Sequence, residues 1–459
     1  MQPFNTTIAA LSTPPGKGGV ALIRVSGADA VAVSDSVFRA KSGISLREAP
    51  NRHAIYGDVY ADGETIDDAI VTVFRAPASY TGEDTVEFTT HGGMLIVSSV
   101  LSALYVAGAT PAERGEFTRR AYLAGKLSLS EAEAIGELLD ADTTAQIKLF
   151  RRSSRERLSA ALAALYDGVC GLLSALCAKI DYPDEDLADL TTEELLARLV
   201  PIRESAEQLL STYRTGRAVA TGVRTVLLGK PNVGKSSLYN LLCRREAAIV
   251  TDVAGTTRDV LEERVSLGEI LLLLADTAGI RETEDRIEKI GVSRSRAAAE
   301  EAELIFALFD GASPADSEDL SLIEFLDTLS GFKIALLNKR DLGTAFDETL
   351  LTGHVDAILP FSALSDGTEK LRQLTEGFFT DGSIRVGEQA ILSSARQYAA
   401  LLHGLTCLKG AEEALLSGMA FDAALCDLES ALCAFAESDG RAVNDDVVSG
   451  IFEKFCVGK

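Results

Sequence analysis

The segment GKPNVGKS at residues 229–236 constrains the fold of this 459-residue chain more than any other stretch. It matches GxxxxGK[ST], follows an apolar run at residues 225–228 and precedes a helix-favouring run from Ser237, which is the context of a phosphate-binding loop. Its glycines let backbone N–H groups face phosphates, Lys235 supplies charge to the outer phosphates, and Ser236 can ligate Mg²⁺. The N-terminus of the following helix adds partial positive charge. The segment therefore predicts a nucleotide-binding α/β domain.

Three further motifs follow at the ends of predicted strands: DTAG at 276–279, NKRD at 338–341 and SA at 362–363. Strand ends are where an open α/β sheet binds its ligand. Asp276 can reach the Mg²⁺ shell, and Gly279 can sense the outermost phosphate. Asp341 can accept two hydrogen bonds from guanine N1 and N2, which adenine cannot offer. Ser362 and Ala363 can present a backbone N–H to guanine O6.

A Thr-rich segment, TDVAGTTRD at 251–259, lies between these motifs, where a threonine can complete the Mg²⁺ shell and report the outermost phosphate. Together the motifs predict a GTP site and strongly favour it over an ATP site. Its residues are Asn232, Val233, Gly234, Lys235, Ser236, Ser237, Thr251, Asp252, Val253, Ala254, Gly255, Thr256, Thr257, Asp276, Thr277, Ala278, Gly279, Asn338, Lys339, Asp341, Ser362, Ala363 and Leu364.

Catalysis of GTP hydrolysis needs a water-orienting group that the sequence does not place in the usual position. Ile280 follows DTAG and cannot orient a water as Gln does, and no nearby Arg is placed as a finger in cis. Asn232 is a candidate ligand for a monovalent cation that supplies the charge instead. The acidic run after Ile280 offers water-orienting candidates, although each acid alone is more often solvated. They are Glu282, Glu284, Asp285 and Glu288.

The texture of the chain predicts four segments: an α+β domain at 1–120, Ala/Leu/Glu-rich helices at 121–221, alternating strands and helices at 222–382, and helices again at 383–459. A final segment of this size makes a marginal core alone. We therefore expect an α/β P-loop GTPase domain inserted into an all-α helical domain, preceded by the α+β domain. The alternative is two separate helical domains.

Composition narrows the class of protein. The formal charge is −24, which disfavours a bulk polyphosphate binder because nucleic-acid affinity comes mainly from Lys and Arg. No uninterrupted apolar run approaches the ~20 residues that span a bilayer, and the absence of a basic residue before Lys17 argues against a signal or transit peptide. The seven cysteines form no CxxC pair, so we expect buried thiols in a reducing compartment and a cytoplasmic protein without a membrane partner.

Several stretches together resemble the MnmE (TrmE) family of tRNA-modification GTPases. The motifs of the nucleotide site would also fit ribosome-assembly GTPases, but the flanking segments match this family. They are TPPGKGGVALIRVSG at 13–27, YTGED at 80–84, HGG at 91–93, GEFTRRA at 115–121, GKL at 125–127 and FCVGK at 455–459. The alternative function is a GTP-controlled RNA or ribosome assembly factor without one-carbon chemistry.

The resemblance implies a tetrahydrofolate-binding, dimerising N-terminal domain and K⁺-stimulated hydrolysis when two GTPase domains meet. K⁺ would be held by Asn232, Thr251, Val253 and Thr256. Mg²⁺ would be held by Ser236 and Thr257, with Asp276 in its second shell. Glu288 would orient the water and Lys235 would act on the phosphates. K⁺ would then replace an arginine finger.

The resemblance also implies partners and a second ligand. An FAD protein of the MnmG (GidA) type would join the homodimer in a heterotetramer, with FAD only on that partner. Together they would add a carboxymethylaminomethyl or aminomethyl group to carbon 5 of the wobble uridine of certain tRNAs. The carbon donor would be 5-formyl- or methylene-tetrahydrofolate, contacted by Arg24, Glu83, Lys126 and Lys459.

Two further features carry hypotheses. Cys456 is a candidate nucleophile or redox thiol, but no neighbouring base is visible, so we expect packing and shaping of the folate site instead. Lys148, Arg151, Arg152 and Arg155 recur at helical spacing, which predicts one basic helix face. That face is either an ordinary solvated surface or a contact for the tRNA backbone.

Overall fold

The computed structural model describes residues 6–61, 63–181, 191–246, 263–275, 297–380, 384–418, 421–442, 445–453 and 455–459. The chain divides into two compact units, one of Met1–Gly136 with Asp439–Lys459 and one of Glu137–Ser438. The C-terminal residues thus belong to the N-terminal unit, although their sequence texture grouped all of 383–459 with the helical domain.

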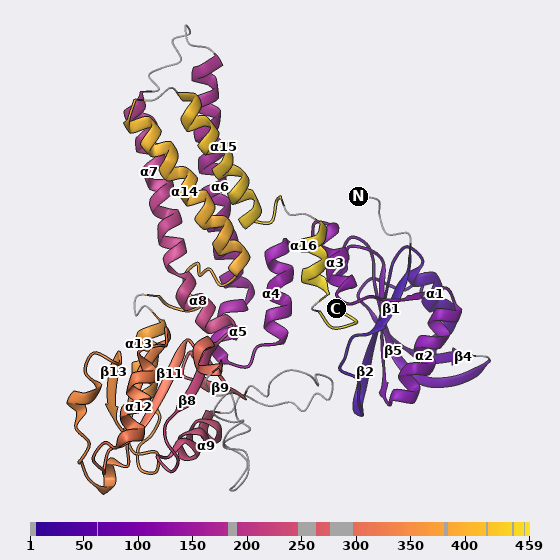
Figure 1. The fold of residues 1–459 in the computed structure, drawn as a ribbon. Coiled ribbons are helices and arrows are strands. Elements are labelled where there is room, and N and C mark those ends of the chain that lie inside the picture. Colours follow the sequence, from indigo (N-terminus) through magenta and orange to yellow (C-terminus); the bar gives the residue numbers. More distant parts are fainter. Residues whose placement is uncertain are drawn as a thin grey trace. The chain divides into compact units, whose positions relative to one another are not determined.

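The first unit is built on a seven-stranded sheet in the order β3-β4-β5-β6-β2-β1-β7 (Figure 1). Neighbours are antiparallel except β1 and β7, which run parallel. The strands are β1 (Ile8–Leu11), β2 (Gly18–Ser26), β3 (Phe38–Ala40), β4 (Ala54–Ala61), β5 (Glu64–Phe74), β6 (Thr85–Gly92) and β7 (Thr110–Pro111).

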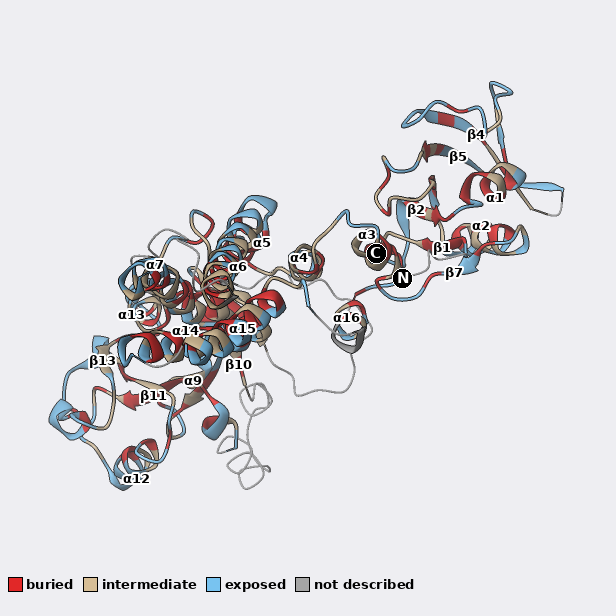
Figure 2. Ribbon diagram, turned by 90° about the horizontal axis from the view of Figure 1, so that it is seen from above, coloured by how far each residue is buried: buried red, intermediate tan, exposed pale blue. Residues whose placement is uncertain are grey.

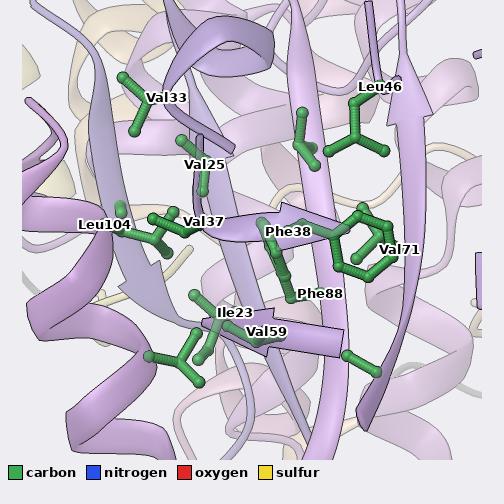
Figure 3. Close-up of a cluster of buried hydrophobic side chains, with 14 of the residues drawn as sticks. Ile23, Val25, Val33, Val37, Phe38, Leu46, Val59, Val71, Phe88 and Leu104 are labelled. Carbon is green, nitrogen blue, oxygen red and sulfur yellow. The ribbon is translucent and has the colours of Figure 1, made fainter. Parts of the chain in front are cut away.

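Alternate residues of these strands form one apolar face, which packs against the helices α1 (Ala30–Val37) and α2 (Met94–Val106). Figure 3 shows this core: Ile23 and Val25 of β2 and Phe88 of β6 point to the same side as Val71 of β5. Because side chains alternate along a strand, the same register leaves the polar residues on the opposite face. The α+β prediction for this part is confirmed.

Three short helices and the chain end complete the unit. They are α3 (Glu116–Leu123), α4 (Leu129–Leu139), which runs into the second unit, and α16 (Asp445–Phe452). Ser128 and Glu131 form a capping box at the start of α4, since Glu131 N donates to Ser128 Oγ and Ser128 N to Glu131 Oε2.

The second unit contains a helical bundle whose helices come from both sides of the α/β domain, side by side in Figure 1. Leu162, Leu172, Leu199, Leu405 and Leu428 are buried in one shared core. The insertion of the α/β domain into a helical domain is therefore confirmed, rather than two separate helical domains. The bundle helices are α6 (Arg152–Asp181), α7 (Thr192–Ser211), α14 (Ala395–Leu416) and α15 (Phe421–Ser438).

One helix in the described residues, α6, is long and apolar enough to cross a membrane by length and composition alone. The sequence contained no long uninterrupted apolar run, but an 18-residue window within Arg152–Ile180 tolerates isolated polar residues and reaches a mean hydropathy of 1.7. Its leucines and valine at three- and four-residue spacing pack against α7 and α15. This is the pattern of a bundle core helix.

The α/β domain has a six-stranded sheet in the order β13-β12-β11-β8-β10-β9, parallel except for the β9–β10 hairpin. Helices α9 and α13 cover one face and α12 covers the other, so β11 between them is buried (Figure 2). The strands are β8 (Val223–Leu228), β9 (Glu263–Leu267), β10 (Ile270–Leu274), β11 (Leu304–Asp310), β12 (Phe332–Asn338) and β13 (Ala357–Pro360). The helices are α9 (Lys235–Glu246), α12 (Ser317–Leu326) and α13 (Glu369–Phe379).

Two short helices join bundle and α/β domain: α5 (Thr144–Phe150) and α8 (Tyr213–Ala220). Gln146 of α5 donates to the Ala220 carbonyl at 2.9 Å. Arg217 of α8 pairs with Glu303 just before β11, and Arg264 of β9 pairs with Asp142 at 2.9 Å. The α/β domain is therefore fixed to the bundle through ion pairs and a side-chain to backbone bond.

Candidate functional sites

The phosphate-binding loop lies between β8 and α9, as the sequence predicted. Gly229 and Gly234 have positive φ, and Asn232 adopts the left-handed conformation at φ 62°, which is uncommon for a residue with a side chain. Lys235 Nζ donates to the carbonyls of Gly229 at 2.6 Å and Lys230 at 2.9 Å. Burial lowers the pKa of the Lys235 ammonium. The partly desolvated Lys235 ammonium, at the N-terminus of α9, is therefore suited to bind an anion.

Asn338 joins the phosphate loop to the loop after β13. Its Nδ2 donates to the Val233 carbonyl at 2.6 Å, and its Oδ1 accepts from the Ala363 N–H at 3.0 Å. Asn338 is 3% exposed, so both bonds are shielded from water. A Cβ on Gly234 would lie 2.1 Å from Asn338 Nδ2, which explains why glycine is needed there. This one side chain therefore holds both ends of the predicted nucleotide site.

The Ala363 bond differs from the sequence-based expectation. Its N–H was expected to face guanine O6, yet in the structure it donates to Asn338, so it reaches O6 only by exchanging that acceptor. The Ser362 N–H donates to Asp366 Oδ2 at 2.8 Å. Leu364 is 87% exposed.

The remaining residues of the base-binding motif follow β12. Lys339 has φ 62°, and its Nζ donates to Asp310 Oδ2 at 2.8 Å. Asp341 is exposed at the start of a 3₁₀ turn. Exposed Leu342 stands beside it, 72% accessible. This end of the sheet thus offers an exposed carboxylate and two exposed apolar side chains, Leu342 and Leu364, which suits a flat base that carries N–H donors.

The predicted nucleotide site is described in part. The described members are Asn232, Val233, Gly234, Lys235, Ser236, Ser237, Asn338, Lys339, Asp341, Ser362, Ala363 and Leu364. The other predicted residues lie outside the described residues, namely Thr251, Asp252, Val253, Ala254, Gly255, Thr256, Thr257, Asp276, Thr277, Ala278, Gly279 and Glu288. Of the predicted K⁺ ligands only Asn232 is described.

A second cluster lies in the N-terminal unit around Arg120, which is 2% exposed. Its guanidinium pairs with Glu83 at 3.1 Å and with Glu116 at 2.7 Å, and it donates to the Thr6 carbonyl at 2.8 Å. Ser26 Oγ also donates to Glu83 Oε2 at 2.8 Å. Glu83 is a predicted folate contact, and the structure shows that its charge is already balanced inside the protein.

Arg24, another predicted folate contact, is likewise paired. Its guanidinium donates to Glu87 across the β2–β6 ladder at 2.8 Å. It lies over the rings of Tyr80 and Phe117, 5.0 and 5.6 Å from their centroids. Stacking on two rings fixes the plane of the guanidinium. Arg24 therefore offers an oriented edge rather than an unbalanced charge.

The C-terminal tail docks beside this cluster. The Phe117 N–H donates to the Lys459 carbonyl at 3.1 Å, and Ser12 Oγ donates to the Gly458 carbonyl at 2.9 Å. A Cβ on Gly458 would lie 2.0 Å from the Leu11 carbonyl, so the close approach needs glycine. Cys456 is exposed. The tail thus brings Lys459 and Cys456 to the domain that holds the other predicted folate residues.

Lys126 contacts the loop between β5 and β6, and its Nζ donates to the carbonyls of Pro77 and Ser79, each at 2.7 Å. These bonds hold the loop that carries Glu83. All four predicted folate residues thus lie in one unit, around the loop at 75–84 and the ends of the chain.

The prediction of one basic helix face is wrong. Helix α5 ends at Phe150, Arg151 has an extended ψ of 151°, and α6 begins at Arg152, so the four residues span a corner. Arg151 and Arg157 both donate to the Gly387 carbonyl at 2.8 Å, where the chain returns from the α/β domain. One of the four predicted members, Arg151, therefore has a local structural use.

Three members of that set, Lys148, Arg151 and Arg152, are exposed. Lys148 lies 3.9 Å from Glu269, and Arg152 pairs with Glu156 on the same helix. Arg155 is partly buried. The corner still presents positive charge, but from two helices.

Sequence reasoning missed Arg120, although it lies in the quoted segment GEFTRRA. An i, i+4 Glu–Arg pair, Glu116 with Arg120, was a visible signal for one of its bonds. The bond to Glu83 joins residues 37 apart in sequence, so no local sequence pattern predicts it.

Comparisons with known proteins cover the whole chain. The family model for the GTP-binding protein TrmE N-terminus matches residues 7–126, and the MnmE helical domain model matches residues 129–456. The tRNA modification GTPase MnmE of Listeria innocua serovar 6a is 40% identical over 458 residues, 99% of each chain. The protein of the same name from Lactococcus lactis subsp. lactis is 37% identical over 99% of this chain and 98% of its own.

Among solved structures, the G domain of the T. maritima FeoB iron transporter matches 34% of this chain and 98% of its own. It is 20% identical, with a TM-score of 0.25.

Proposed function

The chain belongs to the MnmE family of tRNA modification GTPases, and we propose that it hydrolyses GTP to drive a carbon transfer to carbon 5 of the wobble uridine of certain tRNAs. Hydrolysis of GTP in tRNA modification follows from the family. The proposal adds the group transferred, a carboxymethylaminomethyl or aminomethyl group. It also adds a homodimer that pairs with an FAD protein of the MnmG type, and a folate one-carbon donor.

The observation that carries the GTPase half is the Asn338 bridge, which couples the phosphate loop to the loop that meets the base. In this arrangement Lys235 contacts the outer phosphates, while Asp341 accepts from the two N–H groups of guanine. Glu288 orients the attacking water. Replacing Glu288 by Ala should lower GTP turnover strongly while nucleotide affinity stays nearly unchanged. A normal turnover rate would exclude Glu288 from this role.

Mg²⁺ and K⁺ are the metals that this proposal needs. Ser236 at the start of α9 fits a hydroxyl ligand for Mg²⁺, with Thr257 as the second and Asp276 behind them. Asn232, held in a left-handed conformation in the phosphate loop, offers an amide oxygen of the kind that K⁺ prefers, with Thr251, Val253 and Thr256 as the other ligands. Bound K⁺ would supply positive charge beside the phosphates. Turnover in KCl should exceed turnover in NaCl at equal ionic strength, and equal rates would refute the K⁺ proposal.

The folate half rests on the cluster of Arg24, Glu83, Lys126 and Lys459 in the N-terminal unit. Arg24 presents an edge held between two rings, and the tail brings a lysine beside it. Basic groups of this kind pair with the carboxylates of a folate, and a carboxylate binds the amino edge of a pterin. Cys456 then shapes the site from an exposed position rather than from a packed core. Binding of 5-formyl-tetrahydrofolate, measured by calorimetry, tests this half, and no measurable binding would favour an assembly factor without one-carbon chemistry.

The decisive experiment reconstitutes tRNA modification with the full chain and a MnmG-type partner. Omitting GTP, the folate or K⁺ in turn should abolish or strongly slow formation of the modified uridine. Modification at full rate without the folate would contradict the donor, and modification at full rate without GTP would contradict the coupling to hydrolysis.

A further inference from the structure

Lys230, the second residue of the phosphate loop, makes an ion pair that the nucleotide motif does not require. Its Nζ donates to Asp316 Oδ2 at 2.6 Å and to Asp319 Oδ2 at 2.7 Å. The Asp319 side chain is only 2% exposed, and that of Lys230 is 17% exposed. The Asp316 side chain is 53% exposed, so the contact with the buried Asp319 is the one that is much firmer than a surface ion pair.

The two aspartates form the N-terminus of α12. Asp316 caps this helix by accepting from the Glu318 and Asp319 N–H groups, and Asp319 accepts from the Asp316 N–H. Their carboxylates therefore cannot shift without loosening the first turn of α12. Lys230 is tied to a rigid point of the opposite face of the sheet.

The same lysine also touches the phosphate-binding residue through its backbone. The Lys230 carbonyl accepts from Lys235 Nζ at 2.9 Å. A loop held at Lys230 therefore fixes one of the two carbonyls that aim the Lys235 ammonium.

The segment between β11 and α12 extends this support to the base-binding end. Asp310 at its start pairs with Lys339 at 2.8 Å, and the Gly311 N–H donates to the Asn338 carbonyl at 2.7 Å. One ten-residue stretch, 310–319, thus contacts the phosphate loop at one end and the NKRD motif at the other.

We propose that Lys230, Asp316 and Asp319 form a positioning clamp that sets the phosphate loop for GTP by tethering it to the N-terminus of α12. The inference rests on the proposed GTPase function and names residues that need not touch the nucleotide. The clamp acts through the Lys230 carbonyl on Lys235, so its loss costs nucleotide affinity even where the fold survives.

The test measures two quantities on each full-length variant: the Kd for a fluorescent N-methylanthraniloyl-GDP, and the urea midpoint of the nucleotide-free protein. Lys230→Met should raise the Kd about tenfold, the change that one lost charge-assisted contact corresponds to. It should also lower the urea midpoint, because it leaves the buried Asp319 carboxylate unpaired. Lys230→Arg, which keeps the charge, should retain most of the affinity.

A double variant separates positioning from stability. Adding Asp319→Asn to Lys230→Met removes the unpaired charge and should restore much of the urea midpoint, while the Kd stays raised because the tether is still missing. Lys370→Met, at an exposed position of α13, is the matched control and should change neither quantity.

Two results would overturn the clamp: a wild-type Kd in Lys230→Met, or a Kd that recovers together with the urea midpoint in the double variant. Failure of the wild-type chain to bind the probe would instead contradict the GTPase function itself.

Discussion

In the nucleotide site the Lys235 ammonium contacts two carbonyl oxygens, whereas in the N-terminal cluster the guanidinium groups of Arg24 and Arg120 contact carboxylates. The first cation is partly desolvated and, among the described residues, meets no opposite charge. The guanidinium groups of Arg24 and Arg120 are both neutralised by carboxylates, and Arg120 is buried while Arg24 is half-buried. The charge of Lys235 is therefore sufficient to attract a ligand with several negative charges to the nucleotide site.

The second site selects its ligand by other means. Glu83 and Arg24 already have partners, so a ligand there gains by hydrogen bonds, ring contacts and shape rather than by neutralising a bare charge. The difference predicts that charge removal damages nucleotide affinity at one site and folding at the other. The variants below test this division, beginning with the largest expected effect.

Arg120→Met should destabilise the N-terminal unit by about 3–5 kcal/mol, because it leaves Glu83 and Glu116 as uncompensated carboxylates in a buried setting. The loss of stability is measured by urea unfolding, with hydrogen exchange of strands β1 and β2 as the probe. Nucleotide affinity should stay at the wild-type value. Arg114→Met, at an exposed position nearby, is the matched control. Equal stability of the two variants would show that the buried network is not structural.

Asn338→Ala should have the opposite profile. It removes two buried hydrogen bonds and leaves the Val233 carbonyl and the Ala363 N–H without this partner, which corresponds to a roughly 100-fold rise in the Kd for GDP. Protection of β1 and β2 against hydrogen exchange should not change. Asn240→Ala, exposed on α9, serves as control. A nucleotide affinity within error of wild type would mean that the two loops hold their positions without the bridge.

The strand ends that carry the described nucleotide motifs were predictable because these motifs are local. Each predicted strand was found within a few residues of its place, and parallel strands bring their carboxyl ends to one edge whatever the rest of the chain does. Residue spacing could not predict that Ala363 would be engaged by Asn338, nor that Lys230 would reach α12, because these contacts depend on side-chain conformations across two loops.

The N-terminal cluster was predictable only in part, because the family resemblance led to four of its residues but not to Arg120 or to the contacts. The resemblance named Arg24, Glu83 and Lys459, yet the bonds that hold the cluster join distant parts of the chain, such as Phe117 with Lys459. The basic face failed for a different physical reason. Spacing of three and four residues assumes an unbroken helix, and the extended backbone at Arg151 turns the chain before the second turn of the pattern is complete.

The corner of α5 and α6 offers the next test, because some of its cations bond to backbone carbonyls and others lie beside carboxylates. The exposed Arg151 donates to a backbone carbonyl, whereas the other two exposed members, Lys148 and Arg152 (the outward pair), lie beside glutamates. We propose that the outward pair contacts the tRNA backbone. Lys148→Glu with Arg152→Glu should weaken tRNA binding roughly tenfold and reduce the salt slope by about 2, the loss of two phosphate contacts.

The control for this pair is Arg198→Glu with Lys370→Glu, which gives the same change in net charge at two other exposed positions. It should leave the salt slope unchanged. If both double variants weaken binding equally, the effect comes from net charge alone, and the corner is an ordinary solvated surface.

The smallest expected effect comes from an ion pair on the surface of the N-terminal sheet. Removing this charge should change neither nucleotide affinity nor stability by much. His91 Nδ1 lies 2.8 Å from Asp67 Oδ1, and the Asp67 carboxylate raises the pKa of the imidazole above its ordinary value. The protonated imidazole therefore stabilises the fold fully below the unfolded pKa of about 6.5, and the contribution disappears as pH rises through the raised pKa. The His91 side chain is 61% exposed, so solvent screens most of the attraction.

The Tm difference between wild type and His91→Asn should be small at pH 6 and vanish by about pH 9. The control variant His53→Asn, at an exposed position before β4, should show no such trend. A Tm difference that grows with pH would mean that Asp67 stabilises the neutral imidazole rather than the protonated one.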